Sequence, residues 1–223
     1  MRDHSVVEVE EQLKKKFPDL SALLCRINDV NVKQSDPNLE KFKEQIIKDV
    51  AKRYTIDSLK DTPIFRAYRD FFWKIGIDPT KTRPAAEALI RRIIIGTPIP
   101  RVNTLVDAYN LASIETGVSI AAFDADKLNG KLLMRQAISS EVFFGIGMDK
   151  QRLLQGEEVI IQDNEKIIAI YPYRDAENTK IIYSTNNIEL MICGVPGISE
   201  QQLLNALQVT TNYITKFCDG ILT

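Results

Sequence analysis

The sequence predicts an α+β fold in a single compact domain, and three observations support this prediction. Helical patterns come mostly first in the chain, and strand-like patterns come mostly after residue 118, an order typical of α+β proteins. The 223 residues are 44% hydrophobic and 26% charged, which is the composition of an ordinary globular protein. Because the chain shows no internal repeat and no low-complexity linker, one unit over residues 1–223 is favoured over two domains.

The expected helices share apolar residues at every third or fourth position, together with residues that begin or end a helix. Asn103 can cap a helix through its side-chain oxygen, and Gly117 can end that helix in a left-handed conformation. Ser199 and Gln202 form a capping-box pattern before the last helix. Helices are therefore expected over residues 8–17, 39–54, 62–76, 84–93, 103–117 and 199–217.

The expected strands are short apolar runs bounded by turn residues such as Gly130 and Asn164. They cover residues 20–32, 119–123, 131–137, 158–161, 166–171, 180–183 and 189–193. The aromatic residues between positions 65 and 73 are more typical of a core than of a surface that stacks nucleic-acid bases.

Scarce residue types argue against several kinds of chemistry. The only histidine is His4, near a terminus, which disfavours a Ser-His-Asp or Cys-His triad and a His-ligated metal. The three cysteines are far apart and form no C-x-x-C motif, so neither a disulfide framework nor a zinc site is expected, and a reducing cytoplasm is indicated. We therefore expect a cytoplasmic protein with no metal and no cofactor.

Charge and hydropathy limit the partners. The net charge is −1, so any contact with RNA must come from a local basic patch and not from an overall field. The first ten residues are too polar for a signal peptide, and no apolar run approaches the roughly 20 residues that span a membrane. No membrane partner is expected, and the oligomeric state stays open.

A basic segment between residues 66 and 101 holds eight Lys and Arg against three acidic residues, a surplus of about +5. Arg presents a fork of donors that matches phosphate oxygens, so Arg83, Arg91 and Arg92 are candidates for binding RNA. The alternative is a set of solvated helix faces with ion pairs, such as Arg83–Glu87 or Glu87–Arg91.

A polar stripe follows the basic segment. Asn103, Asp107 and Asn110 are spaced i, i+4, i+7 and share one face of a helix. Together with Asp124, at the end of the next strand, they could line a polar pocket. The alternative is that Asn103 is only a cap and Asp107 only an ion-pair partner.

Two further candidates lie near strand ends. In the run from Tyr171 to Asp175, Tyr173 could stack on a ring, Arg174 could hold a phosphate or carboxylate, and Asp175 could orient Arg174 or accept from an amine. The alternative is an ordinary turn with a local ion pair. Thr185, within the polar stretch 184–187, could orient a water or a ligand, or could serve only turn chemistry.

Several short motifs occur along the chain in a fixed order. They are Asn103…Asp107…Glu115-x-Gly117, Phe123-Asp124, Asp126-Lys127-Leu128-x-Gly130, Arg135-x-Ala137, Gly156-Glu157-Glu158-Val159-Ile160 and Thr185-x-x-Ile188. In this order they resemble the B3/B4 domain of the bacterial phenylalanyl-tRNA synthetase β subunit over about residues 60–220, with residues 1–60 as an N-terminal extension. Residues 193–198 and the Tyr-Arg-Asp loop look more like freestanding B3/B4 proteins.

The resemblance implies a B3/B4-like mixed sheet with flanking helices, tRNA or aminoacyl-tRNA as the partner, and hydrolysis of wrongly charged aminoacyl-tRNA in trans. The protein would then be an aminoacyl-tRNA deacylase and not a synthetase. Asn103, Asp107, Asp124 and Thr185 are the residues that the resemblance carries over, and Tyr173, Arg174 and Asp175 come from the loop pattern above. We expect Thr185 and Asp175 to be catalytic. We expect the substrate to be bound by Asn103, Asp107, Asp124, Tyr173 and Arg174.

The chain departs from the synthetase pattern in three places. Ala121 stands where the synthetase has an editing-site histidine, and Met191 falls near its editing-site glutamate. The run from Tyr171 to Asp175 corresponds to its glycine-rich segment. The amino-acid pocket must therefore differ from that of the synthetase. The alternative function is a module that binds an amino acid or an RNA end without catalysis.

Overall fold

A first sheet of five antiparallel strands organises the fold. The computed structural model describes residues 4–222. In this sheet the strand order is β1 (Ser5–Val6), β3 (Ala22–Asn28), β11 (Ile188–Cys193) and β4 (Ser119–Asp124), and β12 (Ile221–Leu222) also pairs with β3. Strand β11 pairs along its whole length with both β3 and β4. All six residues of β4 are buried, so this strand lies in the core.

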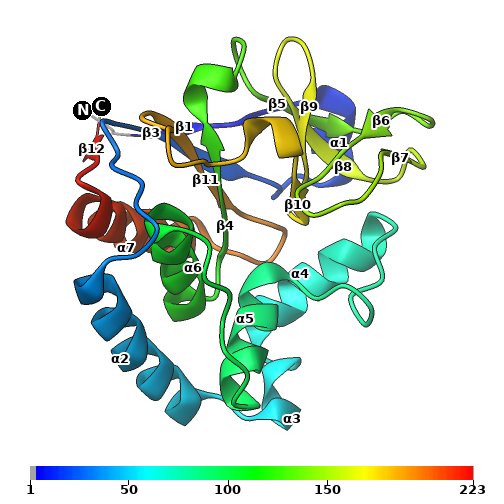
Figure 1. Cartoon of the computed structure of the whole chain (residues 1–223). Coiled ribbons are helices and arrows are strands. Elements are labelled where there is room, and N and C mark those ends of the chain that lie inside the picture. Colours follow the sequence, from blue (N-terminus) through cyan, green and yellow to red (C-terminus); the bar gives the residue numbers. More distant parts are fainter. Residues whose placement is uncertain (1–3, 223) are drawn as a thin grey trace.

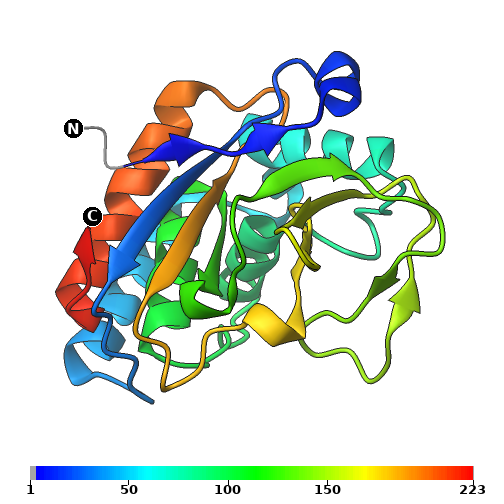
Figure 2. The same cartoon turned by 90° about the horizontal axis from the view of Figure 1, so that it is seen from above.

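A second sheet packs beside the first (Figure 2). Its order is β10 (Arg174–Asp175), β9 (Ile167–Ile170), β8 (Val159–Gln162), β5 (Leu133–Gln136) and β2 (Glu8–Val9). The β2–β5 pair is parallel and the other pairs are antiparallel, which confirms a mixed sheet. A two-stranded ribbon, β6 (Val142–Phe143) and β7 (Arg152–Leu153), extends from it.

Helices cover one face of the first sheet and close one side of the molecule (Figure 1). They are α2 (Pro37–Arg53), α3 (Ile56–Leu59), α4 (Pro63–Lys74), α5 (Ala85–Ile94), α6 (Thr104–Thr116) and α7 (Glu200–Cys218), whereas the short helix α1 (Glu11–Lys16) follows β2 and lies by the second sheet. Two short 3-10 helices, η1 (Ala125–Lys127) and η2 (Glu177–Thr179), complete the elements. Helices α6 and α7 pack on each other and against strands of the first sheet. No helix within residues 4–222 has the length and apolar character needed to cross a bilayer.

The expected helix caps are confirmed. The Asn103 side chain accepts from the Val106 N–H at 2.9 Å, and Gly117 ends α6 with φ of 76°. Ser199 and Gln202 form the capping box of α7. Because these caps depend only on neighbouring residues, the sequence alone could place them.

Three sequence predictions need correction. The strand expected over 180–183 is a turn, closed by the Ile182 N–H donating to the Thr185 hydroxyl and the Thr185 N–H donating to the Ile182 carbonyl, both at 3.0 Å. The strand expected over 20–32 ends at Asn28, because Asp29 takes a positive φ of 55° and turns the chain. The first residues of the helix expected over 8–17 form β2 instead, since they pair with β5.

The aromatic face of α4 lies in the core, as expected. Phe65, Tyr68, Phe71 and Phe72 are buried, whereas Trp73 is 57% exposed. The Tyr68 hydroxyl donates to the Cys193 carbonyl at 2.5 Å and accepts from the Ser119 N–H at 3.0 Å. One phenol of α4 therefore ties together the paired ends of β4 and β11.

Candidate functional site

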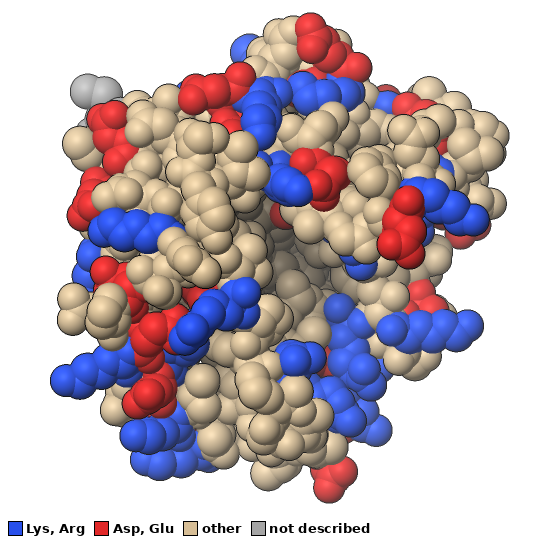
Figure 3. Space-filling view, in the orientation of Figure 1, with Lys and Arg blue, Asp and Glu red and all other residues tan. Residues whose placement is uncertain are grey.

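A cavity of about 180 Å³ lies where the two sheets meet. Its walls come from β4 and β11 of the first sheet, from Tyr109 and Asn110 of α6, and from residues 169–175 of the second sheet. In the space-filling view the face is hollowed at its centre, over the region where β4, β10 and α5 meet (Figure 3). These three elements each contribute lining residues to the cavity.

The corner between β9 and β10 is held firmly in place. The Tyr171 hydroxyl donates to the Gly194 carbonyl at 2.6 Å, next to the carbonyl that Tyr68 uses. The Tyr171–Pro172 peptide bond is cis. The Tyr173 ring meets the edge of Phe72 with 6.4 Å between ring centroids. The side chains after this corner are therefore fixed relative to β11.

Arg174 lies against the same corner. Its guanidinium stands 5.0 Å from the centroid of the Tyr173 ring, and its Nη1 donates to the Ile146 carbonyl at 2.5 Å. Its buried Nε has no hydrogen-bond partner within residues 4–222. Arg174 belongs to the lining of the cavity, and its unpaired Nε is itself fully buried.

Asp175 is the acidic group of the cavity. Its carbonyl accepts from the Ile146 N–H at 2.9 Å, but its carboxyl oxygens receive no hydrogen bond from any described residue. Burial raises the pKa of Asp175 to about 7, although the nearby Arg174 acts in the opposite direction. A carboxyl group with such a pKa is half ionised near neutral pH.

Other polar groups at the cavity are also unpaired. The Ser119 hydroxyl is buried with no partner, and no hydrogen bond from the described part of the chain reaches the Tyr109 hydroxyl or the Asn110 amide. Burial and the carboxylates of Asp175 and Asp107 raise the pKa of Tyr109 well above its usual value. Of these three groups the Ser119 hydroxyl is the buried one, and the half-buried Tyr109 and Asn110 present open polar groups to the cavity, as the polar groups of a ligand pocket do.

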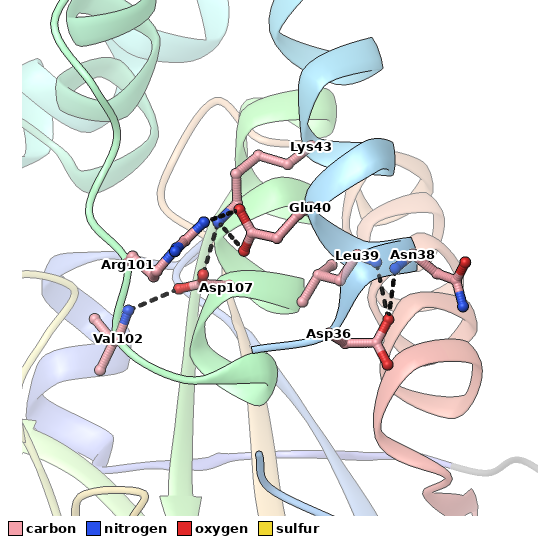
Figure 4. A network of polar contacts seen from close by, with 8 residues as sticks. All are labelled: Asp36, Asn38, Leu39, Glu40, Lys43, Arg101, Val102 and Asp107. Atoms are coloured by element: carbon pink, nitrogen blue, oxygen red, sulfur yellow. Dashed lines mark hydrogen bonds and ion pairs between the residues drawn. The ribbon is translucent and has the colours of Figure 1, made fainter. Parts of the chain in front are cut away.

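Asn103 and Asp107 do not line the cavity. Asn103 caps α6, and the buried Asp107 accepts from Lys43 Nζ at 2.7 Å and from the Val102 N–H at 3.0 Å (Figure 4). Lys43 also donates to Glu40 at 3.2 Å, and Arg101 does so at 2.5 Å. Burial would raise the pKa of Glu40, but the hydrogen bonds from Arg101 and Lys43 hold it below its usual value. This network joins α2 to the start of α6.

Asp124 and Thr185 lie together, away from the lining of the cavity. The Thr185 hydroxyl donates to the Asp124 carboxylate at 2.9 Å, and Lys127 Nζ approaches the same carboxylate at 3.3 Å. Both Asp124 and Thr185 are buried. Of the seven residues expected at a catalytic or substrate site, the cavity brings together Tyr173, Arg174 and Asp175.

The basic segment is partly neutralised. Glu87 is buried and pairs with Arg69 at 2.9 Å and with Arg83 at 3.9 Å. Arg92 Nε donates to the Pro98 carbonyl at 2.8 Å, whereas no ion pair between Glu87 and Arg91 occurs among the described residues. Lys and Arg side chains still gather along part of the rim of the central hollow (Figure 3).

Ala121 and Met191 are partners across β4 and β11, and both line the cavity. Two positions 70 residues apart in the chain therefore form one piece of its wall. The sequence analysis did not place Tyr109 or Ser119 at the site. No local pattern marks them, because their role depends on which face of α6 and which end of β4 meet the second sheet.

The fold and the cavity define an α+β domain with a small, partly polar cavity at the junction of two sheets. The family model for the B3/4 domain matches residues 67–219, and the chain therefore belongs to the B3/4 domain family.

Relatives of this chain include phenylalanine–tRNA ligase β subunits. That of Mycoplasma genitalium is 29% identical over 113 residues, which are 50% of this chain and 14% of the relative. That of Geobacter metallireducens is 34% identical over 109 residues, which are 48% of this chain and 13% of the relative. That of Fusobacterium nucleatum is 38% identical over 88 residues, 39% of this chain and 11% of the relative. The chain thus matches only a small part of these proteins.

A solved structure shares the fold. It is an N-terminal fragment of the phenylalanyl-tRNA synthetase β subunit from Pyrococcus horikoshii, with a TM-score of 0.51 and 14% sequence identity. The similarity covers 96% of this chain and 49% of that one. At this identity the likeness concerns the fold alone, and it confirms the mixed α+β architecture.

Proposed function

We propose that this protein binds the aminoacylated end of tRNA and hydrolyses wrongly charged aminoacyl-tRNA in trans. The observation that carries the proposal is the Asp175 carboxyl group, which is unpaired, has a pKa of about 7 and faces a small cavity of a B3/4 domain. An aminoacyl ester is already activated, so a positioned water and one base suffice to cleave it.

Asp175 is the proposed general base. Its carboxylate takes a proton from a water whose oxygen attacks the ester carbonyl carbon. The tetrahedral intermediate then breaks its bond to the ribose oxygen, which receives that proton, and the products are the free amino acid and the tRNA. A pKa near the working pH is the value at which such a base is most effective.

Arg174 and Tyr173 are the proposed substrate-binding residues. Arg174 lines the cavity beside Asp175, so its positive charge can stabilise the negative charge that develops on the carbonyl oxygen. The cavity volume of about 180 Å³ lies below the ~300–1,000 Å³ of pockets for drug-sized ligands. This size suits an aminoacyl residue.

The other expected site residues lie outside the cavity, and we propose roles for them that need no contact with the aminoacyl group. Asn103 and Asp107 fix the start of α6, which carries Tyr109 to the cavity. Asp124 and Thr185 fix the end of β4 and the turn before β11. We assign these four residues to positioning the walls of the cavity, and we assign Arg83, Arg91 and Arg92 to contacts with the tRNA backbone.

A second candidate function is binding of an amino acid or an RNA end without hydrolysis. The observation that favours it is the pair Ala121 and Met191, which lines the cavity where the synthetase pattern has its histidine and glutamate. Neither side chain can transfer a proton, so catalysis would rest on Asp175 alone.

A deacylation assay separates the two functions. The purified protein is incubated with a panel of tRNAs, each charged with a non-cognate amino acid. We expect at least one to be hydrolysed, with a loss of about 10²–10⁴-fold in Asp175→Asn, the usual contribution of a general base. Asp19→Asn, at an exposed aspartate on the surface, is the control and should retain full activity. Hydrolysis of none of the panel, together with binding of charged tRNA, would support the second function.

A further inference from the structure

A second pocket lies on the face of the first sheet that the helices leave open. The helices stand behind this sheet in Figure 2, and the open face points toward the viewer. The pocket, here called the sheet-face pocket, has a volume of about 470 Å³ and shares no lining residue with the cavity of Asp175. Residues 5–8 of β1 and β2 line it on one side and residues 125–132 on the other, and β3 and β11 form its base. Its volume is within the range of pockets for small organic ligands.

Arg26 of β3 and Glu189 of β11 form an incomplete ion pair at the base of this pocket. They are cross-strand partners, but Arg26 Nη1 and the Glu189 carboxylate are 3.9 Å apart, which is beyond hydrogen-bond distance. The Glu189 side chain is only 19% exposed, and its carboxylate receives no hydrogen bond from residues 4–222. Burial raises the pKa of Glu189 above its usual value, although Arg26 acts in the opposite direction. The carboxylate of Glu189 therefore still lacks a donor.

The guanidinium of Arg26 also retains open donors. Its Nε donates to Asn28 Oδ1 at 3.2 Å, and its Nη2 lies 3.8 Å from Asp126, whose carboxylate accepts from Asn187 at 3.1 Å. Neither Nη group makes a hydrogen bond within the described part of the chain. Because the two Nη groups present N–H donors side by side, Arg26 can accommodate a carboxylate of a ligand.

The rim of the pocket carries one further charge of each sign. Lys131 and Glu8 line it, both are exposed, and no ion pair joins either of them to another described residue. A phosphate bound at Arg26 would thus lie near the Glu189 carboxylate, and a polyamine bound at Glu189 would lie near the guanidinium. A ligand that carries an ammonium group and a carboxylate on neighbouring atoms can complement both charges.

The remaining wall of the pocket is aliphatic. Leu24, Leu128 and Leu132 contribute to it, and none of the described residues that line the pocket is aromatic. Leu24 and Leu128 are half-buried, so part of each side chain is open to a ligand. Such a wall suits an aliphatic side chain, which would gain by leaving water there.

We propose that the sheet-face pocket binds a free α-amino acid with an aliphatic side chain. The carboxylate of the amino acid pairs with Arg26, its ammonium group donates to Glu189, and its side chain lies against Leu24 and Leu128. This site is separate from the cavity of Asp175 and does not depend on the proposed hydrolysis of aminoacyl-tRNA.

The test is a titration of the full chain with L-leucine, isocaproate and isoamylamine, followed by NMR of the backbone amides. Isocaproate keeps the side chain of leucine but lacks its ammonium group, and isoamylamine lacks its carboxylate. Leucine is expected to shift the amide signals of Gly130 and Glu189. It should also bind about tenfold more tightly than either analogue, because each analogue loses one charge-assisted hydrogen bond.

Two variants assign the two charges of the ligand. Glu189→Gln should weaken leucine binding about tenfold but should not weaken isocaproate binding, and Arg26→Gln should do the same for leucine but not for isoamylamine. Glu44→Gln and Arg53→Gln, at exposed residues of α2, are the matched controls and should bind leucine as the wild type does. A melting temperature equal to that of the wild type confirms that each variant is folded.

Four results would overturn the inference. They are absence of leucine binding, shifts confined to the cavity residues Tyr173 and Asp175, an analogue that binds as tightly as leucine, and unchanged leucine affinity in Glu189→Gln or Arg26→Gln. The comparison of leucine with its analogues uses the wild type, so it decides the matter even where a variant does not fold. Leucine binding in the sheet-face pocket without deacylation of any tRNA contradicts the proposed enzyme alone, whereas deacylation without leucine binding contradicts the sheet-face pocket alone.

Discussion

At the scale of single residues, Asp175 sets the pH dependence of stability. Its pKa of about 7 in the folded protein lies above the ordinary aspartate value of 3.8. The folded state therefore holds a proton that the unfolded chain has lost between about pH 4 and pH 7. Folding stability must fall as pH rises through this window, because the unfolded state binds fewer protons there.

The variant Asp175→Asn tests this dependence, since asparagine keeps the shape and cannot ionise. Above pH 7 the variant is expected to be more stable than the wild type by about 1–3 kcal/mol, after solvent access through the cavity is allowed for. Below pH 4 the two should be equally stable. Urea unfolding at several pH values measures the difference, and a gap that does not change with pH would contradict the assigned pKa.

The same titration governs the proposed activity. Asp175 must be ionised to act as the base. For a charged tRNA that the protein hydrolyses, kcat/KM is therefore expected to rise tenfold per pH unit below about pH 7 and to level off above it. Asp19→Asn should show the same profile as the wild type. A profile that is flat between pH 5 and pH 8 would exclude Asp175 as the base.

The buried Lys43–Asp107 pair gives a second residue-scale prediction. Lys43→Met leaves the Asp107 carboxylate buried without its cation, and we expect a loss of about 3–5 kcal/mol in the free energy of unfolding. The double variant Lys43→Met/Asp107→Asn should regain part of this loss, because the unpaired charge is gone. Lys41→Met, at an exposed position on the same helix, is the control and should change stability little. Chemical denaturation provides the values.

At the scale of elements, Tyr68 connects α4 to both β4 and β11. Tyr68→Phe removes a hydroxyl that satisfies the Ser119 N–H and the Cys193 carbonyl, both buried. The expected cost is about 1–3 kcal/mol. Hydrogen exchange of the Ser119 amide should also become faster than that of other buried amides. A general loss of stability would instead speed up exchange at all of them. Tyr183→Phe, at a tyrosine that is 61% exposed, is the control.

The sequence predicted the long elements well for a physical reason. Helices α2, α6 and α7 have side-chain caps at neighbouring residues, and α2, α4, α5 and α7 show a clear apolar periodicity within their own residues. The two-residue strands β1, β6, β7, β10 and β12 escaped prediction, because two residues show no alternation and such strands exist only through their partners. The strand expected over 180–183 had an apolar pattern, but hydrogen bonds to Thr185 close it into a turn.

The sequence predicted only part of the site, because a local pattern reveals only residues that are neighbours in the chain. Tyr173, Arg174 and Asp175 are neighbours in the chain, so a local pattern could reveal them. Their meeting with Tyr109, Ser119 and Met191 depends on how the two sheets pack. The polar stripe of α6 identified a helix beside the cavity, but its Asp107 faces α2, because Lys43 there supplies a buried cation.

At the scale of the whole molecule, the net charge of −1 means that the proposed RNA binding would depend on local clusters of basic residues. If Arg83, Arg91 and Arg92 each contact a phosphate, the affinity for tRNA must fall steeply with salt. Each Arg→Ala substitution is expected to reduce the slope of log Kd against log salt concentration by about 0.7–0.9. The Arg69–Glu87 pair remains in Arg83→Ala, so the fold should be preserved.

Fluorescence anisotropy with labelled tRNA at several salt concentrations measures these slopes. Lys14→Ala, at an exposed lysine on α1, is the control and should leave the slope unchanged. Equal slopes in the wild type and in all three Arg variants would place the RNA on another face of the molecule.

Two phenol groups described above have a joint consequence for how the protein moves. Tyr68 from α4 and Tyr171 from the second sheet end on consecutive carbonyls, those of Cys193 and Gly194. Helix α4 and the corner that lines the cavity are thereby fastened to two neighbouring peptide units, so we expect them to shift together and not to open like a hinge. A ligand is then expected to enter a cavity of constant width. The residues that line the cavity should superimpose within about 1 Å between structures with and without ligand.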